Sequence, residues 1–198
     1  MISISRIVKI EDTEKKILKI TAEFVKFHSY SFLKHCMAKS KKDLKKAIIY
    51  IHGKGGNHRE AEQYRQNCPE CNIYGVDYQD DFPWVVQEKI LDVYNRLNKK
   101  YDCIYVLANS IGAYFSMHTL QKADIKKAFF ISPILDMERL ILDMMRWAEV
   151  SEDELAEKEE IPTDFGETLS WKYFCYVREH PISWEIPTEI LYGENDSM

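Results

Sequence analysis

The sequence predicts an α/β protein with a mostly parallel central sheet, crossover helices and one helical insertion. After residue 46, short apolar runs alternate with amphipathic segments, which is the pattern of strand–helix–strand units. The runs are apolar at consecutive positions, as strands buried on both faces of a parallel sheet are. The segment 134–181 interrupts this alternation and is about three times longer than a crossover connection requires.

The expected elements follow from these runs in chain order. Strands are expected at 47–51, 73–77, 103–108, 128–131 and 189–192. Helices are expected at 58–67, 84–97 and 111–120, the second because its apolar residues keep near-helical spacing. A strand pair is expected in the N-terminal part, before Leu33.

We therefore divide the chain into three parts. Residues 1–133 are expected to form the core with its N-terminal strands, 134–181 a helical cap, and 182–198 the return to the core. Within the cap, Ser151 and Glu154 fit the S-x-x-E pattern of a capping box. Six apolar residues of the cap could line a pocket, although packing is the expectation for each: Met144, Met145, Trp147, Trp171, Phe174 and Tyr176.

Composition and charge exclude several classes of protein. Hydrophobic residues make up 45% of the chain and charged residues 30%, which is typical of globular proteins and not of disordered ones. No apolar run approaches the roughly 20 residues of a membrane span, and the start does not resemble a signal peptide. Residues 1–46 carry 12 Lys/Arg against 5 Asp/Glu, but lack the interleaved aromatics of a nucleic-acid surface. We expect a cytoplasmic protein without nucleic-acid or membrane partners.

The five cysteines are an odd number in a chain without a secretory signal, so reduced thiols are expected. Cys68 and Cys71 have the C-x-x-C spacing of a redox pair or of half a zinc site. No second pair and no flanking histidines accompany them. We therefore expect neither function for this motif.

The most informative stretch is ANSIGAYFS, residues 108–116, between an expected strand and an expected helix. A serine in a sharp strand-to-helix turn presents its hydroxyl at the carboxyl end of the sheet, and small residues on either side permit the turn. Ala108 and Gly112 are those small residues around Ser110. The pattern is G-x-S-x-G with alanine in the first position. Such a serine can also be a plain helix N-cap.

A glycine-rich loop, HGKGGN at 52–57, directly follows the first expected strand of the core. Such a loop can bring backbone N–H groups close to a reacting carbonyl. We expect the N–H of Lys54 or Gly55, together with that of Ile111, to form an oxyanion hole. The spacing GxxxxGK[ST] of a phosphate loop is absent. His52 stands beside these glycines and is expected to have a structural role.

From residue 47 onward, the ordered motifs HGKGG, ANSIG and LYGEND make the chain resemble the α/β-hydrolase family. The resemblance is to small bacterial serine hydrolases with a helical cap. It implies Ser110 as the nucleophile, Ile111 and Lys54 at the oxyanion, and Asp196 as the acid, with Asp136 as the alternative. It implies no metal and no organic cofactor.

In this family the catalytic histidine follows the acid, on a loop after one more strand. That position would lie beyond Met198, so the resemblance implies a C-terminally truncated fold without the triad histidine, the last strand and the last helix. His180 and His58 are the internal candidates to replace it. Truncation would also leave the strand 189–192 as an unpaired edge, so we expect self-association there.

The resemblance implies a serine hydrolase that acts on an ester, a thioester or a similar small-molecule acyl substrate. Its activity in this chain is expected to be impaired by the absence of the histidine. The alternative is a non-catalytic small-ligand-binding or relic protein on a hydrolase fold, because the fold alone does not require turnover.

Overall fold

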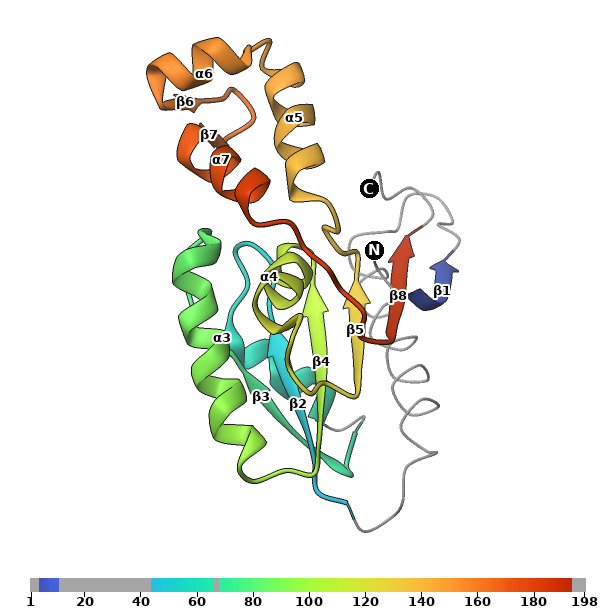
Figure 1. Ribbon diagram of the computed structural model, residues 1–198. Coiled ribbons are helices and arrows are strands. Elements are labelled where there is room, and N and C mark those ends of the chain that lie inside the picture. Colours follow the sequence, from blue (N-terminus) through green and yellow to red (C-terminus); the bar gives the residue numbers. More distant parts are fainter. Residues whose placement is uncertain (1–3, 11–43, 66–67, 194–198) are drawn as a thin grey trace.

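A computed structural model describes residues 4–10, 44–65 and 68–193, and Figure 1 shows their arrangement. The centre is a six-stranded sheet with the order β1-β8-β5-β4-β2-β3, and each neighbouring pair is parallel. The strands are β1 (Ile4–Ile10), β2 (Lys46–Ile51), β3 (Cys71–Gly75), β4 (Cys103–Asn109), β5 (Lys127–Ile131) and β8 (Thr188–Gly193). The predicted parallel α/β architecture is confirmed.

The five strands expected after residue 46 are all present, each within two residues of its expected bounds. The largest shift is that of β3, which begins and ends two residues before the predicted 73–77. At the N-terminus, β1 pairs with β8 instead of forming a local strand pair with its neighbours in the described residues. The remainder of the segment expected to hold that pair lies outside the described residues.

The expectation that 189–192 forms an unpaired edge is wrong. β8 lies between β5 and β1, so both of its sides carry ladder hydrogen bonds. The pairing of β8 with β1 requires a contact between residues more than 170 positions apart, for example Ile7 with Ile190, which local patterns cannot reveal. The expected self-association loses its stated basis and stays an untested prediction.

Both faces of the central strands are buried, as their consecutive apolar residues predict. In β2, Ala47, Ile49 and Ile51 pack on one face, while Ile48 and Tyr50 pack on the other. The first face is covered by α3 (Pro83–Asn98) and α4 (Ile111–Leu120), and the second by η1 (His58–Ala61) and α2 (Glu62–Arg65). None of the described helices is long and apolar enough to cross a membrane.

The segment between β5 and β8 lies beyond the carboxyl ends of the strands (Figure 1). It contains helices α5 (Met137–Trp147), α6 (Glu152–Lys158) and α7 (Trp171–Glu179) and a two-stranded antiparallel hairpin of β6 (Glu160–Pro162) and β7 (Thr168–Ser170). The hairpin was not expected, because strands of three residues carry no readable alternation.

The capping box predicted in this segment is half formed. Ser151 Oγ accepts a hydrogen bond from the Glu154 N–H at 3.1 Å. The Glu154 carboxylate binds the Lys158 ammonium at 2.7 Å instead of returning to the cap. The serine therefore still begins α6, while the glutamate stabilises it through an i, i+4 ion pair.

Candidate functional site

Ser110 lies on a strained turn between β4 and α4. Its backbone has φ 52° and ψ −122°, a left-handed conformation that non-glycine residues rarely adopt. Ser110 occupies the N-cap position of α4, but its side chain makes no capping hydrogen bond. The plain N-cap interpretation therefore does not explain why this residue is a serine.

Close packing around the turn explains its small residues. A Cβ added to Gly112 would lie 2.5 Å from the carbonyl oxygens of both Ile51 and His52, so only glycine fits there. A Cβ on Gly53 would lie 3.2 Å from the Cβ of Ser110. Strands β2 and β4 pair up to Ile51 and Ala108, so the glycine loop and the serine follow at the same sheet edge.

Lys54 and Ile111 line the same cavity as Ser110, a space of about 570 Å³. Ile111 is the first residue of α4, so its N–H is one of the donors that an α-helix leaves free. Among the described residues, the N–H groups of Lys54 and Ile111 donate no backbone hydrogen bond. The predicted nucleophile and the two residues predicted to supply the oxyanion donors thus line one cavity.

The cavity has one apolar wall and one charged rim. The apolar wall is formed mainly by α5 and the chain before it, with Ile134, Met137, Leu140, Ile141 and Met144. At the rim the Lys54 ammonium binds the Glu167 carboxylate and lies 3.6 Å from that of Asp81. Partial burial lowers the pKa of Lys54, but the hydrogen bond to Glu167 and the nearby carboxylates outweigh it, so the pKa is raised. Lys54 therefore carries its positive charge at neutral pH.

Comparisons with known proteins address the fold. No protein-family model matches this sequence, and no curated protein matches it either. The solved structures similar to it include Est1E from Butyrivibrio proteoclasticus, with a TM-score of 0.57 and 17% identity over 79% of this chain and 70% of that chain. They also include alpha/beta hydrolase domain-containing protein 10 from mouse, with a TM-score of 0.59 and 14% identity over 80% of this chain and 72% of that chain.

The chain has the α/β-hydrolase fold. In this fold the nucleophile sits on a strained turn between a strand and a helix, at the carboxyl end of the sheet. Ser110 occupies that place in this α/β-hydrolase fold.

The described part of the chain contains four histidines, and none of them lines the cavity. His52 is buried, its Nδ1 lies 2.8 Å from the carbonyl oxygen of Gly53, and its ring stacks on Tyr78. His58 binds Asp77 through Nδ1 at 2.9 Å. His52 thus has the structural environment that was expected for it, and His58 is engaged away from Ser110.

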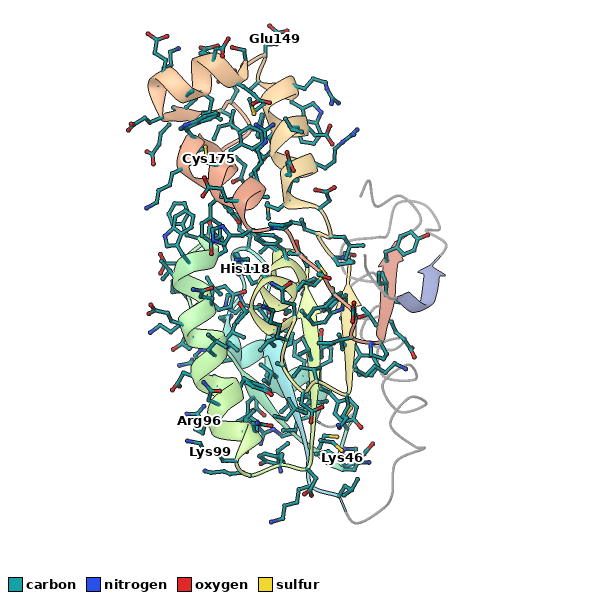
Figure 2. The ribbon with its side chains drawn as sticks, in the orientation of Figure 1. Lys46, Arg96, Lys99, His118, Glu149 and Cys175 are labelled. Atoms are coloured by element: carbon teal, nitrogen blue, oxygen red, sulfur yellow. The ribbon has the colours of Figure 1, made fainter. Side chains whose placement is uncertain are left out.

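The other two histidines lie where α4 meets α7. Figure 2 shows His118 on α4, below the lower end of α7. Its Nε2 lies 3.0 Å from the hydroxyl of Tyr176, while His180 stacks on the Tyr176 ring. Burial, followed by the nearby His180, lowers the pKa of His118. Because His180 contacts α7 and His118 rather than the cavity, its use as a substitute base gains no support.

Of the two candidate catalytic acids, only Asp136 lies in the described part of the chain. Asp136 is the N-cap of α5, and its carboxylate accepts a hydrogen bond from the Arg139 N–H at 2.9 Å. That bond gives Asp136 a structural role at the helix start. Asp196 lies outside the described residues and stays a prediction.

The cysteines Cys68, Cys71 and Cys103 are buried on the second face of the sheet, with Ile48 and Tyr50. Burial raises the pKa of Cys68 and of Cys71 to about 12, so both thiols are protonated at neutral pH. Across the described ranges, no cluster of His, Cys, Asp and Glu could hold a metal ion.

Sequence reasoning missed most of the cavity wall. Met144 and Trp147, for which packing was expected, line the cavity, whereas Met145 and Phe174 are buried in the core as expected. The apolar spacing of α5 was a usable signal, because it leaves more apolar surface than one packed face needs. The rim pair of Lys54 and Glu167 carried no signal, since the residues are 113 positions apart.

Proposed function

We propose that this chain is a serine hydrolase that acts on an ester, a thioester or a similar acyl substrate. One observation carries the proposal: Ser110 is held in a strained conformation at the cavity, and its hydroxyl makes no hydrogen bond within the described part of the chain. Strain of this kind costs on the order of 1–3 kcal/mol and persists where the surrounding structure enforces it. The position at the cavity gives the strain this meaning, because Ser132 also has a positive φ but does not line the cavity.

In the proposed reaction, Ser110 Oγ attacks the carbonyl carbon of the substrate. The carbonyl oxygen becomes negatively charged and accepts hydrogen bonds from the N–H groups of Ile111 and Lys54. Each such donor is worth about 3–4 kcal/mol in comparable enzymes. The leaving group then departs, and water hydrolyses the acyl-serine.

The serine proton must pass to a general base. None of the histidines in the described ranges lines the cavity, and Asp196 is the proposed acid that would orient such a base. In comparable triads, loss of the histidine lowers turnover on the order of a millionfold. We therefore propose that the described residues alone form a severely impaired hydrolase.

The test is labelling with a fluorophosphonate probe, with and without added imidazole, mapped by mass spectrometry. Imidazole is small enough to enter a cavity of about 570 Å³ and can replace a missing base. We expect slow labelling at Ser110 that imidazole accelerates at least tenfold. Ser110→Ala should abolish the labelling.

Ser132→Ala is the matched control, because Ser132 also follows a strand with a positive φ of 41°. It should leave the labelling rate unchanged. A folded chain that is not labelled under either condition would contradict the proposed function.

A second candidate function is small-ligand binding without turnover on the same fold. The observation that favours it is the lack of any histidine at the cavity among the described residues. This candidate predicts ligand binding in the cavity without any imidazole-dependent labelling of Ser110.

A further inference from the structure

The cavity beside Ser110 is chemically divided. Its apolar wall runs along one face of α5, where Met137, Leu140, Ile141 and Met144 follow each other at helical spacing. An extended hydrocarbon chain can contact all of these side chains at once. Burial of each methylene group contributes about 0.8 kcal/mol. A substrate of this cavity can therefore draw its affinity from an apolar chain laid along α5.

The rim of the cavity carries a net negative charge. The charged residues that line it are Lys54, Asp81 and Glu167 in the described ranges, and the Lys54 ammonium is engaged by both carboxylates. One cation and two carboxylates leave one negative charge at the rim. The segment 134–181 above it holds 13 acidic against 5 basic residues, which adds to the same field.

An anionic group at the rim would meet two costs. It would be repelled by Asp81 and Glu167, and it would compete with both carboxylates for the Lys54 ammonium. A neutral group meets neither cost, and a cationic group gains an attraction. The rim therefore selects against anionic ligands.

We infer that the ligand of this cavity is an apolar chain that ends in a neutral or cationic group, with the chain along α5 and the end group at the rim. The assignment of the chain as acyl group and of the end group as leaving group rests on the proposed function. The ligand class itself rests only on the cavity wall and the rim charges.

The experiment compares three ligands with the same chain: n-decyltrimethylammonium, n-decanol and n-decyl sulfate. Their binding to the 198-residue chain is measured by titration calorimetry, below the micelle concentration of each ligand. We expect the cationic and neutral ligands to bind, and the sulfate to bind at least tenfold more weakly than the cation. Because a cavity ligand needs no reaction, this measurement does not depend on Ser110 as a nucleophile.

Two double variants test whether the rim carboxylates cause the preference for the cationic ligand over the anionic one. The double variant Asp81→Asn and Glu167→Gln should reduce the preference for the cation at least threefold. The double variant Asp153→Asn and Asp164→Asn makes the same change in net charge at exposed carboxylates that do not line the cavity, and should preserve the preference.

A further variant tests whether the hydrocarbon chain of the ligand lies along α5. Met144→Trp fills the apolar wall at a half-buried position and should weaken all three ligands at least fivefold. Circular dichroism verifies its fold, and Leu140→Trp provides a second test of the same wall.

Absence of binding by the cation and the alcohol, or tighter binding by the sulfate, would overturn the inference. Equal effects of the two double variants would overturn the role of the rim. Binding with the expected preference but without labelling of Ser110 would leave the ligand class standing while the proposed hydrolase function fails.

Discussion

Ser110 has a strained backbone conformation, and hydrogen bonds to its neighbours hold it there. The Ser110 N–H donates to the Ile131 carbonyl, and its own carbonyl accepts from Ala113 and Ile134. These bonds join the turn to β5, to α4 and to the start of the segment above the sheet. The strain is therefore held by backbone bonds to separate elements, which do not depend on the serine side chain.

Replacing Ser110 with glycine should stabilise the protein. Glycine adopts φ 52° without the steric cost that a Cβ imposes. We expect Ser110→Gly to be about 1 kcal/mol more stable than Ser110→Ala, measured by urea unfolding. The alanine variant is the proper reference, since it also lacks the hydroxyl. Equal stability of the two variants would mean that the turn is not strained.

Gly112→Ala should have the opposite effect. The added methyl group would lie 2.5 Å from the carbonyl oxygens of Ile51, the last residue of β2, and His52, which follows it, so the backbone there would have to shift. We expect a loss of about 2–4 kcal/mol in the free energy of unfolding. Ala113→Ser, one residue further along α4, is a control for the general cost of change in this buried helix. A loss for Gly112→Ala no larger than that of the control would refute the packing argument.

For single residues, the sequence predicts those features that depend on the residue and its immediate neighbours in the chain. Small residues around Ser110 predicted the sharp turn because the turn is made by those residues themselves. The pairing of Lys54 with Glu167 could not be predicted, because it depends on how a distant hairpin lies above the sheet.

Among the elements, the hairpin of β6 and β7 is held to the glycine loop by the charged rim. Glu167 lies in the turn between the two strands and binds Lys54, whose N–H is a proposed oxyanion donor. A link between these side chains ties the position of the hairpin to that of the loop. Both side chains are substantially exposed, so the link is weak and sensitive to salt.

Glu167→Gln should loosen the hairpin and the glycine loop together. We expect backbone hydrogen exchange in 52–57 and 163–169 to rise up to about fivefold at low salt, which is the upper range for an exposed ion pair. At high salt the wild-type protein should approach the variant. Asp164→Asn, in the same turn but away from the rim, should change neither segment. A rise confined to the hairpin would show that the loop is held independently.

The elements themselves were predicted to different degrees. β2, β4, β5 and α4 were predicted nearly to the residue, because fully buried strands leave continuous apolar runs and α4 begins at the turn of Ser110. The hairpin was missed because each of its strands has three residues and only Leu169 among them is buried. Its position is determined by contacts with α5, α6 and α7, which local periodicity does not encode.

In the molecule as a whole, the segment above the sheet is joined to the core by an aromatic contact that includes an ionisable group. His118 on α4 is only 8% exposed and faces Tyr176 of α7 and His180, the residue that follows α7, with Tyr114 of its own helix beside it. The burial that lowers its pKa disfavours the charged form in the folded protein. The unfolded chain carries no such penalty.

Stability should therefore fall as the pH falls below the ordinary histidine pKa of 6.5. In that range the unfolded chain binds a proton at His118 before the folded protein does, so the lower pH favours unfolding. We expect the free energy of unfolding to decrease more steeply between pH 7 and 5 in the wild type than in His118→Gln, by less than one proton in the linkage slope.

The same experiment separates two causes of this dependence. His180→Gln removes the neighbouring charge but leaves His118 buried, so it should lessen the difference without abolishing it, because burial is the larger cause. Wild type and His118→Gln with the same slope would show that the contact between α4 and α7 opens at low pH without cost. That result would make the segment above the sheet a separately moving part rather than one that unfolds with the core.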